Sequence, residues 1–159
     1  MNVSIGICVY NEEKNITNLL TALLNQKTNY INIKEIIVVS SACTDNTDNI
    51  VKSFTKKNKK IKLIQQEKRE GKASAINLFL KKATSPILVL ESGDTIPSKD
   101  TIEKLCLPFK DKKIGMTGAR PIPINNKNNF LGYVIHSWWY IHNKLPRFGE
   151  LIAFRNVIK

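Results

Sequence analysis

The 159-residue chain has 42% hydrophobic residues and a formal net charge of +12, which is typical of one soluble globular domain with a basic surface or with anionic partners. The excess charge comes mostly from lysine, which suits bidentate recognition of bases less well than arginine does, so we expect no specific binding of nucleic acid. No apolar run approaches the ~20 residues that span a bilayer, and the three cysteines lack the spacing of a zinc site or a disulfide framework.

Short apolar runs, which predict buried strands, alternate along the chain with segments that repeat apolar residues at helical spacing. The predicted strands cover residues 3–10, 36–39, 61–64 and 87–90. Four helices are expected between and after them: one capped by Asn11, one that starts at Thr44 or Asp45, one opened by Gly71, and one over residues 98–107 with Ser98 as its cap and Pro108 as its stop. This alternation predicts an α/β fold, a mostly parallel sheet with helices on both faces.

The pattern loosens after the apolar stretch 114–118. Prolines and asparagines over residues 121–129 predict a loop, and residues 130–143 could form a helix that carries Trp138, Trp139 and Tyr140. Residues 151–155 could form a short final strand. The aromatic segment 130–145 is a candidate for contact with a membrane surface or with a second copy of the chain, or for an acceptor-sugar platform.

Right-handed crossovers place the carboxyl ends of parallel strands on one rim of the sheet, where ligands of open α/β sheets bind. Four polar turns are therefore expected to meet there, at residues 10–12, 40–45, 69–72 and 91–94. Neither GxxxxGK[ST] nor GxGxxG is present, which argues against a P-loop and against a dinucleotide site.

The side chains of these turns suit a nucleotide bound to a metal. Asp94 follows a buried strand and could hold Mg²⁺ or Mn²⁺, although it could also simply cap a turn. Lys72 at a helix start combines a point charge with free backbone N–H groups, which suits a phosphate. Tyr10 could stack on a base, and Asn11 and Glu12 could reach the edge of that base or the ribose.

Four segments together resemble the ordered signature of the family 2 glycosyltransferases. They are CVYNEE, IIVVSSACTDNT, REGKASAIN and LESGDTIP, with weaker matches at residues 117–121 and 149–155. The resemblance implies the GT-A fold, a nucleotide-diphosphate sugar donor, a divalent metal and transfer with inversion to an unknown acceptor glycan or lipid. It also implies glycan or polysaccharide synthesis.

The resemblance assigns roles to residues of this chain. It places Tyr10, Asn11 and Glu12 at the nucleoside, and it makes Lys72 and Asn77 flank or support the donor site. Asp94 matches the second acidic position of the DxD-type metal motif, with Ser92 at the first position. Two alternatives stay open: Asn77 could only bond back to the neighbouring loop, and Glu12 could be only a first-turn helix charge.

The chain departs from the family pattern at three places. Ser40 and Ser41 stand where an acidic residue usually contacts the base, so serine hydroxyls would have to bind the base edge. Glu91 lies one residue before the first metal position, and the alternation of a strand would turn its side chain to the opposite face. The ED-type motif that carries the catalytic base is not found, and Glu150 is the only Asp or Glu after Asp111.

We therefore expect residues 1–159 to form a single GT-A-like nucleotide-sugar-binding domain, truncated before the catalytic-base region. The sequence favours a glycosyltransferase whose general base is not identified. The alternative is a non-catalytic nucleotide-sugar-binding module, or half-enzyme, that needs a partner polypeptide. The expected location is the cytoplasm, with peripheral contact to the inner face of the membrane as an open alternative.

Overall fold

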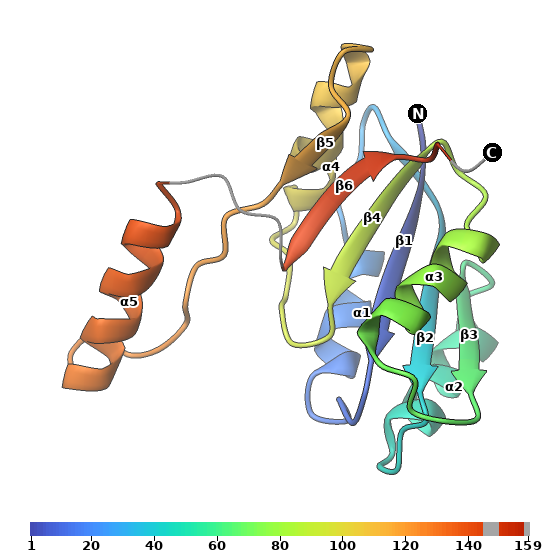
Figure 1. The fold of residues 1–159 in the computed structure, drawn as a ribbon, viewed down its shortest axis with the longest axis horizontal. Helices are drawn as coiled ribbons and strands as arrows, with labels where there is room; N and C mark the ends of the chain where they lie inside the picture. Colours follow the sequence, from blue (N-terminus) through green and yellow to red (C-terminus); the bar gives the residue numbers. More distant parts are fainter. Residues whose placement is uncertain (145–149, 158–159) are drawn as a thin grey trace.

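A six-stranded sheet with the strand order β3-β2-β1-β4-β6-β5 lies at the centre of the computed structural model, which describes residues 1–144 and 150–157 (Figure 1). Strands β1 to β4 are mutually parallel, whereas β6 runs antiparallel to both β4 and β5. The strands are β1 (Asn2–Val9), β2 (Asn32–Ser41), β3 (Ile61–Gln66), β4 (Ile87–Ser92), β5 (Met116–Gly118) and β6 (Leu151–Arg155). The predicted α/β fold with a mostly parallel sheet is confirmed.

Helices cover both faces of this sheet, as the sequence predicts. On one face, α1, α2 and α4 contribute to the larger hydrophobic cluster, whereas α3 packs on the other face. Helix α5 lies beside the sheet, on the side of β6 (Figure 1). The helices are α1 (Ile16–Leu24), α2 (Thr47–Lys57), α3 (Lys72–Lys82), α4 (Thr101–Cys106) with the 3-10 turn η1 (Leu107–Lys110), and α5 (Phe130–His142).

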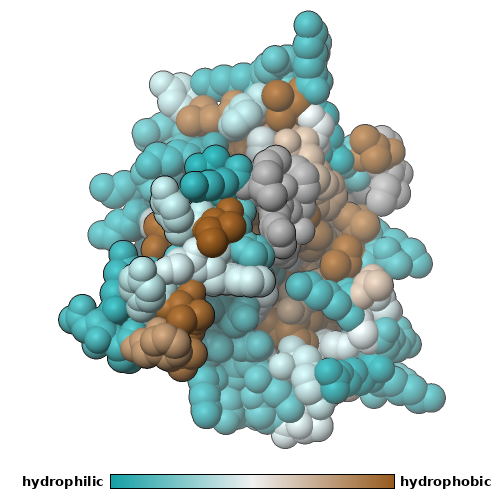
Figure 2. Space-filling model, turned by 60° about the vertical axis from the view of Figure 1, so that its left-hand side comes forward, coloured by the Kyte–Doolittle hydropathy of each residue, from teal (hydrophilic) through white to brown (hydrophobic). Residues whose placement is uncertain are grey.

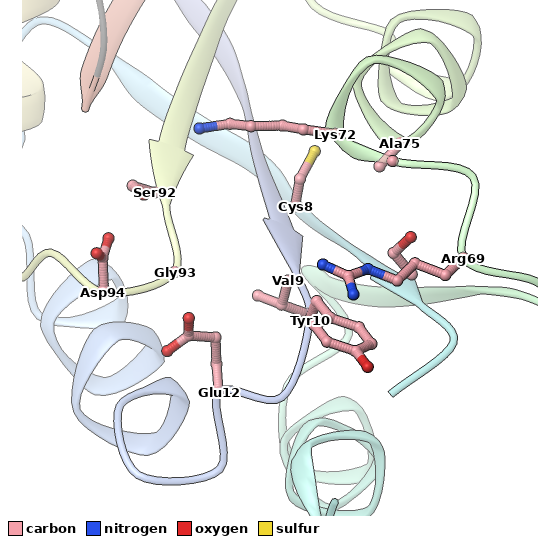
Figure 3. A pocket seen from close by; sticks show the side chains of 12 residues that line it. Cys8, Val9, Tyr10, Glu12, Arg69, Lys72, Ala75, Ser92, Gly93 and Asp94 are labelled. Carbon is pink, nitrogen blue, oxygen red and sulfur yellow. The ribbon is translucent and has the colours of Figure 1, made fainter. Parts of the chain in front are cut away.

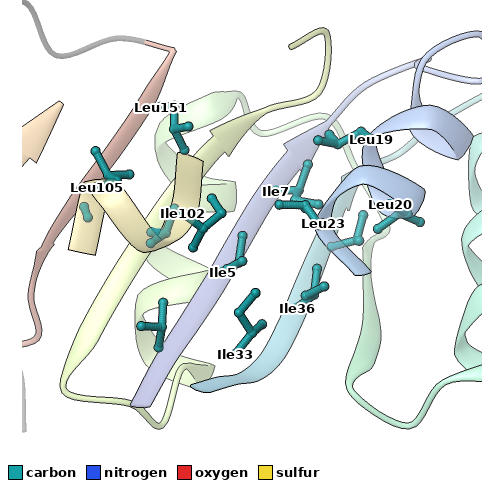
Figure 4. Packing of buried hydrophobic residues seen from close by; sticks show 14 of the residues in the cluster. Ile5, Ile7, Leu19, Leu20, Leu23, Ile33, Ile36, Ile102, Leu105 and Leu151 are labelled. Atoms are coloured by element: carbon teal, nitrogen blue, oxygen red, sulfur yellow. The ribbon is translucent and has the colours of Figure 1, made fainter. Parts of the chain in front are cut away.

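The larger cluster forms because alternate residues of β1 point to the same face of the sheet. Ile5 and Ile7 are fully buried there, under the apolar stripe of α1 that contains Leu19, Leu20 and Leu23 (Figure 4). Ile102 and Leu105 of α4 extend the cluster toward Leu151 of β6. The final strand and α4 thus share the core that positions β1.

The opposite face of β1 depends on Gly6, over which α3 packs. A Cβ atom at Gly6 would lie 2.5 Å from the ring of Phe79, a fully buried residue of α3. The missing side chain is what lets α3 lie directly on the middle of the sheet. The amino end of α3 is held close to the carboxyl ends of the strands in this way.

Three predicted helix boundaries are wrong, each because a loop takes up residues assigned to the helix. Asn11 does not cap α1, because it has φ 55° and the helix begins only after Asn15. Helix α2 begins after Asn46, rather than at Thr44 or Asp45. Helix α4 begins after Asp100, not at Ser98, and Pro108 lies inside the 3-10 turn.

Gly6→Ala should destabilise the protein because the new methyl group has to displace the ring of Phe79. Overpacking of this kind costs about 1–3 kcal/mol of the free energy of unfolding, measured by urea denaturation. Gly115→Ala is the matched control, since a Cβ there has no atom within 4 Å. Equal stability of the two variants would contradict the packing described here.

Candidate functional site

A cavity of about 320 Å³ opens at the rim where the carboxyl ends of β1, β2 and β4 meet the amino end of α3 (Figure 3). Its lining comes from segments that are far apart in the sequence, as the crossing of parallel strands requires. The lining residues are Cys8, Val9, Tyr10, Glu12, Ser41, Arg69, Gly71, Lys72, Ala75, Ser92, Gly93 and Asp94.

Two cations, Arg69 and Lys72, lie on the side of the cavity formed by the β3–α3 turn and the first turn of α3. Lys72 is the first residue of α3, and its side chain extends across the cavity toward the end of β4 (Figure 3). Gly71 at the N-cap has φ 86°, a conformation that side-chain-bearing residues rarely adopt. The first turn of α3 lines the cavity and has no side-chain cap among the described residues, so its N–H groups and the Lys72 ammonium both suit an anion there.

Tyr10 and Arg69 form a stacked pair at one end of the cavity. The guanidinium carbon of Arg69 lies 3.9 Å from the centroid of the Tyr10 ring, a cation–π contact between the two side chains (Figure 3). Tyr10 is 37% exposed, so part of its surface is open to solvent. A planar group could stack at this end of the cavity by taking the place of the guanidinium.

Two carboxylates, Glu12 and Asp94, lie on the other side of the cavity (Figure 3). Asp94 is exposed in the turn after β4, next to Gly93. A Cβ at Gly93 would lie 3.0 Å from Cγ of Glu12, so the glycine allows the Glu12 side chain to approach this turn closely. Asn15 donates a hydrogen bond of 2.8 Å to Glu12 Oε2 and helps to hold the carboxylate in place.

Reciprocal hydrogen bonds join the β1–α1 loop, which carries Tyr10 and Glu12, to the segment that follows β2. The side chain of Asn11 accepts a hydrogen bond of 2.8 Å from the Thr44 backbone N–H and donates one of 3.0 Å to Thr44 Oγ1. The backbone N–H of Glu12 donates to Thr47 Oγ1 at 2.8 Å. The side-chain amide of Asn11 is thus hydrogen-bonded to the neighbouring loop. Its backbone has a left-handed φ of 55°, which asparagine tolerates.

Five of the eight predicted site residues line the cavity together, and three do not. The five are Tyr10, Glu12, Lys72, Ser92 and Asp94. Asn11 is turned to Thr44, Ser40 is fully buried in β2, and Asn77 is exposed on α3 without lining the cavity. The prediction that Tyr10, Lys72 and Asp94 surround one cleft therefore agrees with the geometry.

Ser41 and Arg69 line the cavity, although neither is among the eight predicted site residues; Ser41 was considered only together with Ser40, as a serine that could bind the base edge. Of the two serines only Ser41 lines the cavity, because β2 continues to Ser41 and Ser40 is fully buried within it. The signal for Arg69 was its place in the basic turn before Gly71. Ser41 is 6% exposed, and its Oγ has no hydrogen-bond partner in the part of the chain that the structure describes.

Glu91 is buried behind the site and does not line the cavity, whereas its neighbour Ser92 does. Burial raises the pKa of Glu91 to about 8, and the negative charges of Asp94 and Glu150 add to this effect, against hydrogen bonds from Thr95 and the Ser92 backbone. Thr95 Oγ1 donates to Glu91 Oε1, but Oε2 has no partner among the described residues. Glu91 is therefore largely protonated at neutral pH.

The family model described as "Glycosyl transferase family 2" matches residues 4–155, nearly the whole chain. The chain belongs to this family. Curated relatives include the poly-beta-1,6-N-acetyl-D-glucosamine synthases of Staphylococcus epidermidis, 30% identical over 133 residues, and of Staphylococcus aureus strain COL, 32% identical over 129 residues. These alignments cover 83% and 80% of this chain but only 31% and 30% of the relatives, so the chain spans about a third of their length.

Solved structures of glycosyltransferases share the fold of this family 2 domain. The mannosyltransferase PcManGT from Pyrobaculum calidifontis, in complex with GDP-Man and Mn²⁺, superposes with a TM-score of 0.72 at 24% identity and covers 96% of this chain and 44% of that one. S. aureus TarS in complex with UDP-GlcNAc gives a TM-score of 0.64 at 26% identity and covers 77% of this chain and 37% of that one. These neighbours confirm the predicted GT-A fold.

The carboxylates that line the cavity fit a divalent cation only if a bound nucleotide supplies further ligands to that cation. Among the described residues, no group of three His, Cys, Asp or Glu side chains is arranged to hold a metal ion. Mg²⁺ and Mn²⁺ at nucleotide sites are commonly held by one or two carboxylates, with phosphate oxygens and waters as the other ligands. The exposed carboxylate of Asp94 meets that requirement, whereas the buried Glu91 does not.

Glu91 should make the stability of this domain fall as the pH rises from about 4.5 to about 8. In this window the unfolded chain gives up the proton of Glu91 while the folded chain keeps it, which costs up to about 1.4 kcal/mol per pH unit. Below this window both states are protonated, and above it both are ionised, so the effect is constant. Glu91→Gln should remove this dependence.

The measurement is urea unfolding of both proteins at pH 5, 6.5 and 8 in the presence of EDTA. The variant should gain stability relative to the parent protein as the pH rises. Glu67→Gln, which changes an exposed residue, is the control and should follow the parent protein. A constant difference between Glu91→Gln and the parent protein at all three pH values would refute the raised pKa.

Proposed function

We propose that this family 2 glycosyltransferase domain binds a nucleotide-diphosphate sugar in the cavity at the rim and transfers the sugar, with inversion and with metal assistance, to an acceptor glycan or lipid. The observation that carries the proposal is the charge arrangement of the cavity. An aromatic ring, two cations and two carboxylates lie around a single space of about 320 Å³. A nucleoside diphosphate has a planar base and two phosphates, and it can bring a cation, so it matches all three kinds of group.

The base and the diphosphate can be assigned to different parts of the lining. The base would stack at Tyr10, with Arg69 moving from the ring toward the phosphates, and Ser41 offers a hydroxyl near the same end. The diphosphate would lie at the amino end of α3, where Lys72 and free N–H groups stabilise its charge. The sugar would then be directed toward the end of β4.

Lys72 and Asp94 would act on the leaving group. As the bond between the sugar and the diphosphate breaks, negative charge grows on the departing phosphate, and the ammonium of Lys72 stabilises it. A divalent cation, when bound, supplies further Lewis-acid stabilisation of the same oxygens. Asp94 would hold that cation, with Ser92 and Glu12 nearby in the cavity.

UDP-N-acetylglucosamine is the donor that we propose to test first. The curated relatives with 30% and 32% identity are named as synthases of an N-acetylglucosamine polymer, and TarS is a neighbour solved with UDP-GlcNAc. GDP-mannose is the second donor, because the mannosyltransferase with the same fold was solved with it. Both donors share the diphosphate that Lys72 and Asp94 would recognise.

A half-enzyme that needs further polypeptide for catalysis is the second candidate function. Glu150 is the only Asp or Glu after Asp111, and the chain spans about a third of the length of its curated relatives. Glu150 lies close enough to Glu91 to raise the pKa of the Glu91 carboxyl. Glu150 does not line the cavity, so its position does not support a role as the catalytic base. This candidate predicts donor binding without transfer or hydrolysis, and activity once a longer chain is supplied.

Donor binding should raise the melting temperature in a manner that depends on metal. A donor at ten times its Kd stabilises the folded state by about 1.4 kcal/mol, which corresponds to roughly 3–5 °C for a domain of this size. Lys72→Ala should weaken binding by about 10- to 100-fold, as expected for the loss of a charged hydrogen bond, and Asp94→Asn should abolish the part that depends on Mn²⁺. The measurement is thermal shift with UDP-GlcNAc and GDP-Man, with Mn²⁺ or with EDTA.

Lys59→Ala and Asp100→Asn are matched controls, because they remove exposed or half-exposed charges that do not line the cavity. Both should bind donor like the parent protein. Absence of any shift with millimolar donor and Mn²⁺, or equal binding by Asp94→Asn and the parent protein in Mn²⁺, would contradict the proposed site.

A further inference from the structure

Helix α5 exposes large apolar side chains over most of its length. Phe130 is 85% exposed, Tyr140 68% and Trp138 60%. Leu131, Tyr133, Val134 and Ile141 are also exposed, and so are Ile122 and Ile124 in the preceding loop. Figure 2 turns this side of the molecule forward and shows hydrophobic side chains at its surface, next to hydrophilic ones. So many exposed large apolar side chains on one helix and its preceding loop are unusual for a surface that faces only water.

The loop and the helix hold each other, so the exposed group belongs to an ordered unit. Asn129 caps the helix by accepting a hydrogen bond of 2.7 Å from the Gly132 N–H, and His136 Nε2 lies 2.8 Å from the carbonyl oxygen of Asn125. A Cβ at Gly132 would lie 1.7 Å from the carbonyl oxygen of Asn126, which shows how closely the loop packs on the helix. At the other end, Asn143 Nδ2 donates to the Pro121 carbonyl at 3.0 Å. We call residues 121–143 the aromatic unit.

The charge around the aromatic unit has a single sign. From residue 112 to residue 149 the sequence contains no Asp or Glu. The basic residues of the same stretch are Lys112, Lys113, Arg120, Lys127, Lys144 and Arg147. Lys127 and Lys144 are exposed and flank α5, and the ammonium of Lys144 lies 4.7 Å from the centroid of the Tyr140 ring. An apolar surface flanked by Lys127 and Lys144 complements an anionic surface that has an apolar interior.

The dimensions of α5 fit a position along such a surface and not across it. Its 13 residues extend over about 20 Å, less than the ~30 Å of a hydrocarbon core. Among the described residues, no helix has the length and apolar character needed to cross a membrane. Tryptophan and tyrosine prefer the interface between lipid tails and headgroups, and lysines beside them attract anionic lipids.

We propose that the aromatic unit docks on the surface of a bilayer that contains anionic lipid, with α5 lying in the interface. This inference does not depend on what the cavity binds. In Figure 1, α5 stands at about the level of the carboxyl ends of β1 and β4, so docking through α5 brings the rim of the sheet close to the lipid surface. For the predicted contact segment 130–145, we thus propose the membrane surface as the partner, although Leu145 lies outside the described residues.

The two tryptophans of the chain, Trp138 and Trp139, both lie in α5, so intrinsic tryptophan fluorescence reports on this helix alone. Addition of vesicles of equal parts phosphatidylcholine and phosphatidylglycerol should shift the emission maximum to shorter wavelength. Brominated lipids should quench it, because the indole rings enter the region of the bromines. Vesicles of phosphatidylcholine alone should give a much smaller shift.

Two pairs of variants separate the apolar and the charged contributions, measured by co-sedimentation with the anionic vesicles. Phe130→Ser with Leu131→Ser should reduce binding at least tenfold, whereas Tyr30→Ser with Ile96→Ser, which removes exposed apolar residues elsewhere, should not. Lys127→Glu with Lys144→Glu should reduce binding at least about 25-fold, whereas Lys59→Glu with Lys60→Glu should change it far less. Circular dichroism checks that each variant is folded.

Three outcomes would overturn the proposal. The first is no spectral shift with anionic vesicles. The second is a shift that depends on protein concentration and needs no lipid, which would assign the surface to a second copy of the chain. The third is equal loss of binding in the α5 variants and in their controls, which would reduce the interaction to the net charge of +12. Donor binding by thermal shift is measured on the same variants and should be unchanged, so the two proposals fail separately.

Discussion

The close approach of α3 to the middle of the sheet is the constraint on which the site depends. It exists because Gly6 has no side chain, which leaves room for the ring of Phe79 on one face of β1. The other face of β1 is packed by α1 and α4. With β1 fixed on both faces, Tyr10 at its end and Lys72 at the start of α3 must face the same space. The site is therefore determined by core packing more than by the loops that carry it.

Two buried carboxyl groups, Glu35 and Glu91, lie at opposite ends of the sheet and differ in their hydrogen-bond partners. Burial would raise the pKa of Glu35, but hydrogen bonds from Lys62, Ser4 and Thr84 outweigh it and lower that pKa to about 2. Glu91, at the rim, has no cation beside it in the described residues, and its pKa is raised to about 8. Both oxygens of the Glu35 carboxylate accept hydrogen bonds, whereas Oε2 of the protonated Glu91 carboxyl at the rim has no partner among the described residues. That difference is typical of an end built to receive a ligand.

Sequence patterns predicted the parallel sheet, the layered helices and the meeting of Tyr10, Lys72 and Asp94, because strand alternation and crossover handedness fix these features globally. They could not predict that Asn11 would turn to Thr44, because a left-handed residue and a reciprocal loop contact leave no periodic signal. They named Ser40 and Ser41 together but placed only Ser40 in the site, because the predicted strand ended at residue 39; β2 continues to Ser41, and Ser41 lines the cavity. The predicted start of α4 at Ser98 is wrong because Ser98, a residue type suited to capping, lies in the loop before the helix.

The cavity is lined by both cations and carboxylates, and a ligand that fills it has to meet both kinds of charge. Arg69 and Lys72 attract an anion, whereas Glu12 and Asp94 repel one unless a cation accompanies it. A bare phosphate would satisfy the basic side and leave the acidic side unfavourable. The metal-bound diphosphate of the proposed donor would satisfy both kinds of group, because its phosphates carry negative charge and its cation carries positive charge. In the proposed function, the role of the metal thus rests on Glu12 and Asp94 together, and it would be the same if a different base occupied the end beside Tyr10.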